Sequence, residues 1–296
     1  MDNRRILALG FFDGVHLGHG ALLKACRALA DSVSLPAAAV TFTSHPEALI
    51  TGAAPGLINT QTDRVTLLQT LYGMDEVILL PFDREMMTLS WQDFFHRLLT
   101  VHHAAGLVCG HDFHFGNRGA GTPELLESAC AEAGIPCIIV PEQKINGITV
   151  SSTCIRTFLE NGEMEKAVSF LGHPHILTGQ VVPGRKVGRT IGIPTANLLL
   201  PEGLLCPRHG VYACKAVFDG QQYYAVTNIG TRPTVGGHRI TVEPWILDFS
   251  GDLYGKTLTL EFYKFLRPEQ KFSSLEELQA EIQKNAAQTR EFFANF

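Results

Sequence analysis

The sequence predicts two domains of different classes: an α/β domain built on a parallel sheet over residues 1–175, and a small all-β barrel with a closing C-terminal helix over residues 176–296. Two patterns carry this prediction. Short apolar runs alternate with helical patterns in the first part, whereas β-rich runs separated by turn residues fill the second. The length of 296 residues also exceeds the roughly 150 residues that are common for one domain.

In the first part, alternation of strands and helices predicts a parallel sheet covered by helices on both faces. Ser90 and the pair Thr122-Pro123 mark helix starts, because a hydroxyl caps free N–H groups and proline fits the first helical position. Ligands of such sheets bind beyond the carboxyl ends of the strands. The expected strands are 6–9, 37–42, 76–80, 106–109 and 136–140, and the expected helices are 19–31, 61–73, 90–103 and 123–134.

Near residue 176 the pattern changes from alternating strands and helices to β-rich runs, and we expect the domain boundary at 174–178. Two short helical segments, 153–160 and 163–171, precede it. The barrel strands that follow are expected at 211–218, 223–228, 241–249 and 257–266, with the closing helix at 274–294.

Composition narrows the class of protein. Hydrophobic residues make up 45% and charged residues 18% of the chain, which is typical of a folded globular protein and not of a disordered one. The net charge is −5, and the more basic part, residues 176–296, holds only 13 Lys and Arg against 11 Asp and Glu. Nucleic-acid-binding proteins normally show a basic patch or stripe. The charge therefore favours a small-molecule enzyme with no nucleic-acid partner.

Apolar runs and cysteines both predict a cytoplasmic protein. No apolar run approaches the roughly 20 residues that span a bilayer, and the residues after Met1 do not form a secretion signal. The seven cysteines are odd in number and include no Cys-x-x-Cys pair. We therefore expect reduced thiols and no membrane partner.

A glycine-rich turn at residues 10–19, Gly-Phe-Phe-Asp-Gly-Val-His-Leu-Gly-His, follows the first strand, and a helix is expected to open at its last residue. Free N–H groups and the positive end of a helix dipole make such a turn a phosphate site. His16 and His19 can donate to charge that develops on a phosphorus atom, and Gly18 removes a side chain that would obstruct the backbone. Two alternatives remain: a zinc site, which would need further ligands, and two polar residues that only cap the helix.

A second glycine-rich run, residues 184–198, leads to Pro-Thr-Ala-Asn. Thr195 and Asn197 lie two positions apart, so in an extended segment they point to one side and can offer a hydroxyl and an amide oxygen to Mg²⁺ together with ATP. Taken alone, this tetrapeptide is also a common turn signal.

Over essentially the whole chain, the sequence resembles the HxGH nucleotidylyltransferases, and among them the bifunctional prokaryotic riboflavin kinase/FAD synthetases. The resemblance implies a Rossmann-like first domain and a riboflavin kinase barrel. Three positions depart from the usual motifs, namely Ser44, His114 and Trp245. The motifs that carry the resemblance are 10–19, 41–46, 110–116, 151–156, 184–198, 210–212, 228–234, 242–243, 252–255 and 265–269.

The resemblance assigns roles in the first domain to particular residues. His16 and His19 would be catalytic and bind the α-phosphate region of ATP, while Asp112 and Phe113 would help to place FMN. Arginine suits the ATP site because its planar, permanently charged fork matches phosphate oxygens. The ATP-binding set would be Gly10, Phe12, Asp13, Gly14, His16, Gly18, His19, Ser152, Thr153 and Arg156.

In the second domain, the resemblance makes Glu243 the general base for the ribityl 5′-hydroxyl and places Arg267 at the flavin pocket. Thr195 and Asn197 would hold Mg²⁺ and ATP under a loop that contains Gly184, Gly188 and Gly192.

The resemblance implies two reactions: riboflavin and ATP give FMN and ADP in the second domain, and FMN and ATP give FAD and pyrophosphate in the first. The rivals are an enzyme with one live activity and a non-catalytic flavin or nucleotide sensor.

Overall fold

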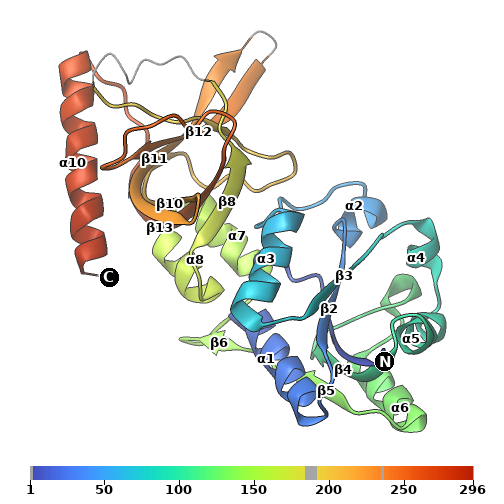
Figure 1. The fold of residues 1–296 in the computed structure, drawn as a ribbon. Coiled ribbons are helices and arrows are strands. Elements are labelled where there is room, and N and C mark those ends of the chain that lie inside the picture. The colour runs from blue at the N-terminus through green and yellow to red at the C-terminus, as the bar shows by residue number, and fades with distance from the viewer. Residues whose placement is uncertain (1–2, 184–191, 235–236, 296) are drawn as a thin grey trace. The chain divides into compact units, whose positions relative to one another are not determined.

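The computed structural model describes residues 3–183, 192–234 and 237–295 (Figure 1). The chain folds into two compact units. The first is Met1–Pro55 with Gln61–Ser152, and the second is Gly56–Thr60 with Thr153–Phe296. Each unit is described below by itself.

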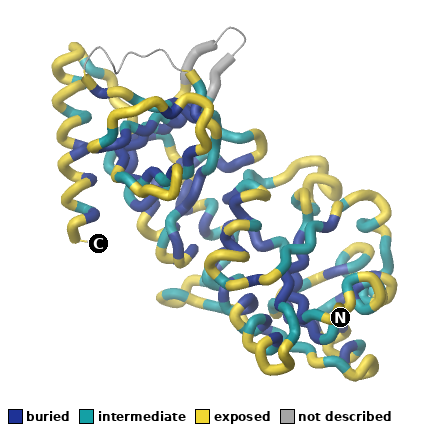
Figure 2. The backbone as a smooth tube through the Cα atoms, in the orientation of Figure 1, coloured by how far each residue is buried: buried dark blue, intermediate teal, exposed yellow. Residues whose placement is uncertain are grey.

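The first unit is built on a five-stranded parallel sheet with the order β3-β2-β1-β4-β5. This order confirms the predicted α/β class and is that of a Rossmann-like sheet. Its central strands are buried (Figure 2), because both faces of a parallel sheet are covered by helices. The strands are β1 (Arg5–Leu9), β2 (Ala37–Phe42), β3 (Glu76–Leu80), β4 (Ala104–Gly110) and β5 (Cys137–Val140).

The helices of this unit include all four that were predicted, and two of their ends differ from the prediction by more than one residue. The first helix begins at Leu17 and not at His19, because His16 is its N-cap. The third predicted helix ends at Thr100 and not at residue 103, because the φ angle of His103 is 53°, which lies outside the range of a right-handed helix. The four are α1 (Leu17–Ser32), α3 (Gln61–Tyr72), α5 (Trp91–Thr100) and α6 (Pro123–Ala133).

Short elements of this unit were not predicted. They comprise α2 (Pro46–Ile50), α4 (Arg84–Thr88), the hairpin β6 (Lys144–Ile145) and β7 (Ile148–Thr149), and the 3₁₀ helices η1 (Asp13–Val15) and η2 (Asn117–Gly119). Segments of two to five residues are too short for a hydrophobic period to appear in the sequence.

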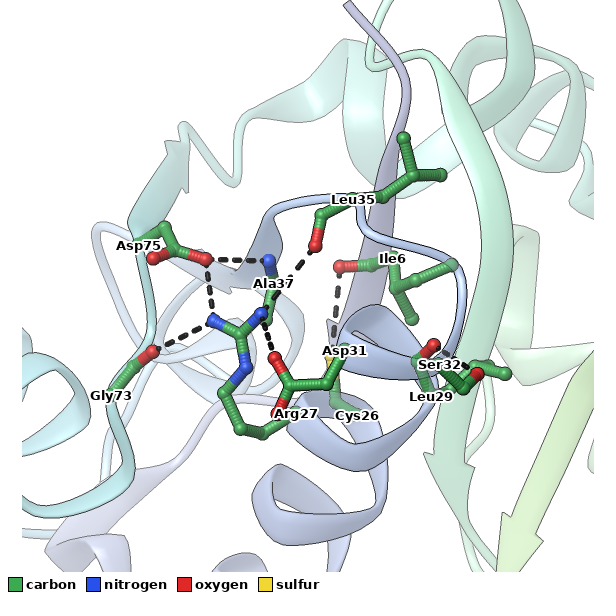
Figure 3. A network of polar contacts seen from close by, with 10 residues as sticks. All are labelled: Ile6, Cys26, Arg27, Leu29, Asp31, Ser32, Leu35, Ala37, Gly73 and Asp75. Carbon is green, nitrogen blue, oxygen red and sulfur yellow. Dashed lines mark hydrogen bonds and ion pairs between the residues drawn. The ribbon is translucent and has the colours of Figure 1, made fainter.

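A polar network fastens α1 to the amino ends of β2 and β3 (Figure 3). Arg27 donates to Asp75 at 2.6 Å, and the same carboxylate oxygen accepts the Ala37 N–H at 2.8 Å. A second contact of Arg27 reaches Asp31, one turn further along α1, at 2.7 Å. The network therefore lies at the amino ends of the strands. The phosphate loop, residues 10–19, lies at the opposite end of the sheet, because it follows the carboxyl end of β1.

The second unit is a six-stranded antiparallel sheet with the order β8-β13-β10-β11-β12-β9. Its two ends approach each other, since a Cβ on Gly179 would lie 3.2 Å from Leu198. The sheet therefore forms a near-barrel, in agreement with the predicted small all-β barrel. The strands are β8 (His175–Gln180), β9 (Leu198–Leu199), β10 (Gly210–Phe218), β11 (Gln221–Thr234), β12 (Gly237–Ile246) and β13 (Thr257–Arg267).

In the part of this unit that the structure describes, there are three helices: α7 (Ser152–Asn161), α8 (Met164–Leu171) and α10 (Leu275–Ala294), the predicted closing helix. The compact units part between Ser152 and Thr153, earlier than the predicted boundary at 174–178, because α8 packs on β8 and β13. Strand β8 occupies the stretch predicted as the boundary. The predicted strand 241–249 ends at Ile246, since Asp248 has a φ of 59°.

None of the helices in the described residues is long and apolar enough to cross a membrane.

Candidate active sites

The phosphate loop has an unusual backbone. Phe12, Gly14 and Val15 have φ angles of 59°, 80° and 44°, so three of four successive residues lie in the left-handed region. A β-branched residue rarely adopts it, and strained backbone of this kind collects at functional sites. Successive turns of this type point N–H groups into one concavity that binds anions.

His16 and His19 lie together, as predicted. Their rings stack with centroids 3.6 Å apart and planes 13° apart. His16 is buried, and its Nδ1 accepts the backbone N–H of His19 at 3.2 Å. It therefore does cap the helix, which one alternative expected, and the predicted catalytic role of the pair stays a prediction. Among the described residues, no group of three or more His, Cys, Asp or Glu is placed to hold a metal ion.

Burial and nearby positive charge lower the pKa of His19 well below its usual value. Burial contributes most, followed by the charges of His16 and Arg64. At neutral pH, His19 is consequently a neutral imidazole, which offers one N–H donor and one acceptor nitrogen.

Neighbouring residues shape the same loop. A Cβ on Gly18 would lie 3.1 Å from the His16 ring and 3.3 Å from the Val150 carbonyl oxygen, and a Cβ on Gly10 would lie 2.9 Å from the Phe12 ring. These two glycines therefore permit close packing within the loop. Asp13 is buried.

Ser152, the last residue of the first unit, contacts the phosphate loop, because its Oγ donates to the Asp13 carbonyl oxygen at 2.9 Å. Thr153 is exposed, and Arg156 donates from Nε to the Gly56 carbonyl oxygen at 2.9 Å. Both of these residues belong to the second compact unit. Their role as a second phosphate clamp stays a prediction.

The first unit contains a cavity of about 730 Å³, which we call the aromatic cavity. Its walls come from the last residue of β2 and from residues that follow β2, β3 and β4. His114 also lines it, with Nδ1 3.0 Å from the Asp112 carbonyl oxygen, whereas Asp112 itself is exposed and is not part of the wall. The phenylalanines that line it are Phe42, Phe82, Phe94, Phe113 and Phe115.

In the second unit, a cavity of about 310 Å³ brings together three residues predicted for the kinase site: Thr195, Glu243 and Arg267. We call it the Glu243 cavity. Glu243 lies on β12 opposite Asn228 of β11, and Thr241 donates to its Oε1 at 3.0 Å. Trp245, two residues further along β12, also lines the wall.

A neighbouring cavity of about 320 Å³, the Tyr254 cavity, shares Thr195 with the first. Asn197 is buried and lines neither of them, while its backbone carbonyl accepts the Val182 N–H at 2.8 Å. Gly192 is exposed, with a φ of 70°. The predicted positions Gly184 and Gly188 lie outside the described residues.

The sequence analysis missed the contribution of α10 to the Glu243 cavity. Leu278, Ile282 and Asn285 of this helix line it. Asn285 is 1% exposed and follows Leu278 and Ile282 at helical spacing, so a polar residue on the apolar stripe was the available signal.

Comparison with known proteins agrees with this arrangement. A family model described as FAD synthetase matches residues 1–154, and one described as riboflavin kinase matches residues 171–293. Bifunctional riboflavin kinase/FMN adenylyltransferase of Listeria monocytogenes is 35% identical over 99% of this chain and 94% of its own. The protein of the same description from Escherichia coli K12 is 38% identical over 97% of this chain and 92% of its own.

A crystal structure from Streptococcus pneumoniae, described as a macrolide-efflux protein, has a TM-score of 0.88 and 31% identity, and covers 97% of this chain and 94% of its own. Both domain families and both full-length relatives lead to one conclusion. The chain belongs to the bifunctional riboflavin kinase/FMN adenylyltransferases, which use ATP to make FMN from riboflavin and FAD from FMN.

Proposed function

We propose that riboflavin is phosphorylated in the Glu243 cavity and that FMN is adenylylated between the phosphate loop and the aromatic cavity. One observation supports the first assignment above all: Thr195 lines both the Glu243 cavity and the Tyr254 cavity. A flavin in the first and a nucleotide in the second would meet at Thr195. Each reaction then has its own place for a flavin and for ATP.

In the kinase reaction, Glu243 acts as the general base. Its carboxylate accepts the proton of the ribityl 5′-hydroxyl while that oxygen bonds to the γ-phosphorus and the bond from this phosphorus to ADP breaks. The 3.0 Å hydrogen bond from Thr241 orients the carboxylate. Arg267 and the apolar side chains of α10 hold the flavin ring in the same cavity.

The side chains of Thr195 and Asn197 fit Mg²⁺. A hydroxyl and an amide oxygen are hard oxygen ligands, which this ion takes together with phosphate oxygens and water. Within the described part of the chain, neither side chain is engaged in another hydrogen bond. When bound, Mg²⁺ would neutralise negative charge on the terminal phosphates of ATP.

In the adenylyltransferase reaction, the phosphate loop holds the triphosphate through its N–H groups and the start of α1. A phosphate oxygen of FMN bonds to the α-phosphorus of ATP, and the bond from this phosphorus to pyrophosphate breaks. His16 and His19 donate to the charge that develops on the α-phosphate oxygens. The flavin ring occupies the aromatic cavity against Phe113, where aromatic surfaces stack.

We also propose that the protein works in a reducing cytoplasm on small molecules alone. All seven cysteines are free thiols, as expected for such a compartment. A net charge of −5 does not favour a nucleic-acid partner.

Chromatography of the products formed from riboflavin, ATP and MgCl₂ tests the kinase site. Glu243→Gln keeps the shape of the side chain but removes the base, so FMN formation should slow about 10²- to 10⁴-fold. FAD formation from supplied FMN should stay at the wild-type rate. Glu202→Gln, an exposed position, is the matched control. Wild-type FMN formation by Glu243→Gln would place the base elsewhere.

A further inference from the structure

Arg64, in the first turn of α3, carries a buried charge that the sequence did not single out. Its side chain is 1% exposed. Burial lowers the pKa of Arg64, and the charge of Asp13 opposes this effect. Burying a charge costs free energy unless hydrogen bonds or an opposite charge compensate it.

The guanidinium of Arg64 joins two segments that are far apart in the sequence. One nitrogen, Nη1, donates to the carbonyl oxygen of Phe11 at 3.1 Å, and the other, Nη2, donates to that of Phe42 at 2.7 Å. The guanidinium carbon also lies 4.4 Å from the centroid of the Phe11 ring. Thr41 donates to the Phe11 carbonyl oxygen as well, at 2.7 Å.

The two carbonyls belong to the two halves of the adenylyltransferase site. Phe11 is the second residue of the phosphate loop, and Phe42 ends β2 and lines the aromatic cavity. The rigid, planar guanidinium of Arg64 therefore fixes the distance between the phosphate loop and the aromatic cavity. A lysine could not hold both carbonyls in this geometry, because an ammonium group is a single point on a flexible stem.

Arg64 also contributes to the charge around His19. The charged or titratable groups in this neighbourhood are His16 at the start of α1, Arg64 on α3 and the buried Asp13 of η1, which faces Arg64. Nδ1 of His19 is buried and has no hydrogen-bond partner among the described residues. A permanent positive charge nearby disfavours a second one on this imidazole.

We propose that Arg64 is a positioning residue for adenylyl transfer, which holds the phosphate loop against the aromatic cavity. The proposal rests on the proposed location of adenylyl transfer at the phosphate loop. The geometry of the two carbonyls carries its first part, and the charge of Arg64 near His19 adds an electrostatic part.

Two variants separate the parts. Arg64→Met removes both the fork and the charge, whereas Arg64→Lys keeps the charge and loses the fork. Steady-state rates of FAD formation from FMN and ATP are measured from pH 5 to 9. Riboflavin kinase activity of the same molecules, circular dichroism and thermal melting report on folding, and Arg84→Met, an exposed arginine, is the matched control.

For Arg64→Met, kcat for FAD formation should fall about 10²-fold, the cost of a small misplacement of reacting groups. The acid limb of its pH profile should move to higher pH, because His19 then gains a proton more easily. For Arg64→Lys, kcat should also fall, but the acid limb should stay where it is in the wild type. Kinase activity should be unchanged in both variants.

Several results would overturn the proposal. Wild-type kcat in Arg64→Lys would show that the planar guanidinium is not needed to hold the two carbonyls. This result would be decisive even if Arg64→Met did not fold. An acid limb that shifts in Arg64→Lys as much as in Arg64→Met, or in neither, would contradict the electrostatic part. If His16→Asn loses FAD formation and neither arginine variant does, the proposal for Arg64 is wrong but the proposed adenylyltransferase site stands. If all three variants form FAD at the wild-type rate, the proposed site is contradicted as well.

Discussion

The Nε atom of Arg267 donates a 3.0 Å hydrogen bond to Oδ1 of Asn285, which connects the end of β13 to the buried face of α10. Glu281, one turn earlier on the helix, lies 3.4 Å from the same nitrogen. Two side chains of α10 thus hold the guanidinium that lines the Glu243 cavity. The closing helix is in this way part of the wall of the Glu243 cavity, where we propose that riboflavin binds, and not only a cover for the barrel.

The anchor on Arg267 leads to a prediction for riboflavin binding. Asn285→Ala should raise KM for riboflavin by about 10- to 100-fold, because a hydrogen bond to a charged group is worth about 1.5–3 kcal/mol. KM for ATP should not change. Asn285→Asp keeps an acceptor and should stay near wild type, and Gln283→Ala, an exposed position on the same helix, is the control. Equal rises in both KM values would point to general disruption of the barrel.

His16 caps α1 in the structure, and we propose that it also donates to the α-phosphate of ATP; two substitutions can distinguish these roles. His16→Asn keeps an acceptor at the N-cap, where asparagine is favourable, but removes the imidazole. It should slow FAD formation by about 10²- to 10³-fold, the usual cost of losing one donor to developing charge. His16→Ala should in addition lower the melting temperature. Wild-type FAD formation in His16→Asn would show that His16 only caps the helix. Stoichiometric zinc in the purified protein would support the alternative of a zinc site.

We expect His175, at the start of β8, to make the barrel sensitive to acid. It is fully buried, neither ring nitrogen has a partner among the described residues, and burial lowers its pKa from 6.5 to about 3. Between these values, the unfolded chain binds a proton that the folded chain does not. The free energy of unfolding should therefore fall by about 1.4 kcal/mol for each unit that the pH drops through this window.

Denaturant unfolding at pH 7, 6, 5 and 4 measures this slope. His175→Leu should flatten it relative to the wild type, because a leucine does not titrate. His96→Leu, exposed in the other unit, should leave it unchanged. Identical slopes in the wild type and in His175→Leu would show that other groups set the acid sensitivity.

The compact units predict how the chain can be divided. A fragment of residues 153–296 keeps α8, whose Met164, Phe170 and Leu171 are buried, and should make FMN but no FAD. A fragment of residues 176–296 loses this helix and should be less stable by several kcal/mol, since each large buried apolar side chain contributes about 1.5–3 kcal/mol. Both fragments lack residues 56–60, whose Leu57 pairs with Leu204. Equal thermal stability of the two would contradict the role given to α8.

The sequence predicted the regular elements better than the contacts between them. The parallel strands β2, which is buried, and β3, which is mostly half-buried, read as plain apolar runs, and their predicted bounds agree with the structure. Arg64 reads as an ordinary helical cation, because the carbonyls that it holds come from two distant segments that no local periodicity reveals. The predicted residues Thr195, Glu243 and Arg267 do share one cavity, whereas the contribution of Asn285 became visible only when α10 was packed on the barrel.

Mixing two variants, each of which lacks one of the two activities, tests most directly the central claim that the two reactions use separate sites. Glu243→Gln should make FAD from supplied FMN but little from riboflavin, and His16→Asn should stop at FMN. Each variant is incubated alone and with the other, with riboflavin, ATP and MgCl₂, and the products are separated by chromatography. The account predicts that only the mixture makes FAD at a substantial rate, because FMN released by one protein serves the other. A mixture that makes no more FAD than either variant alone, although each keeps its one expected activity, would contradict it.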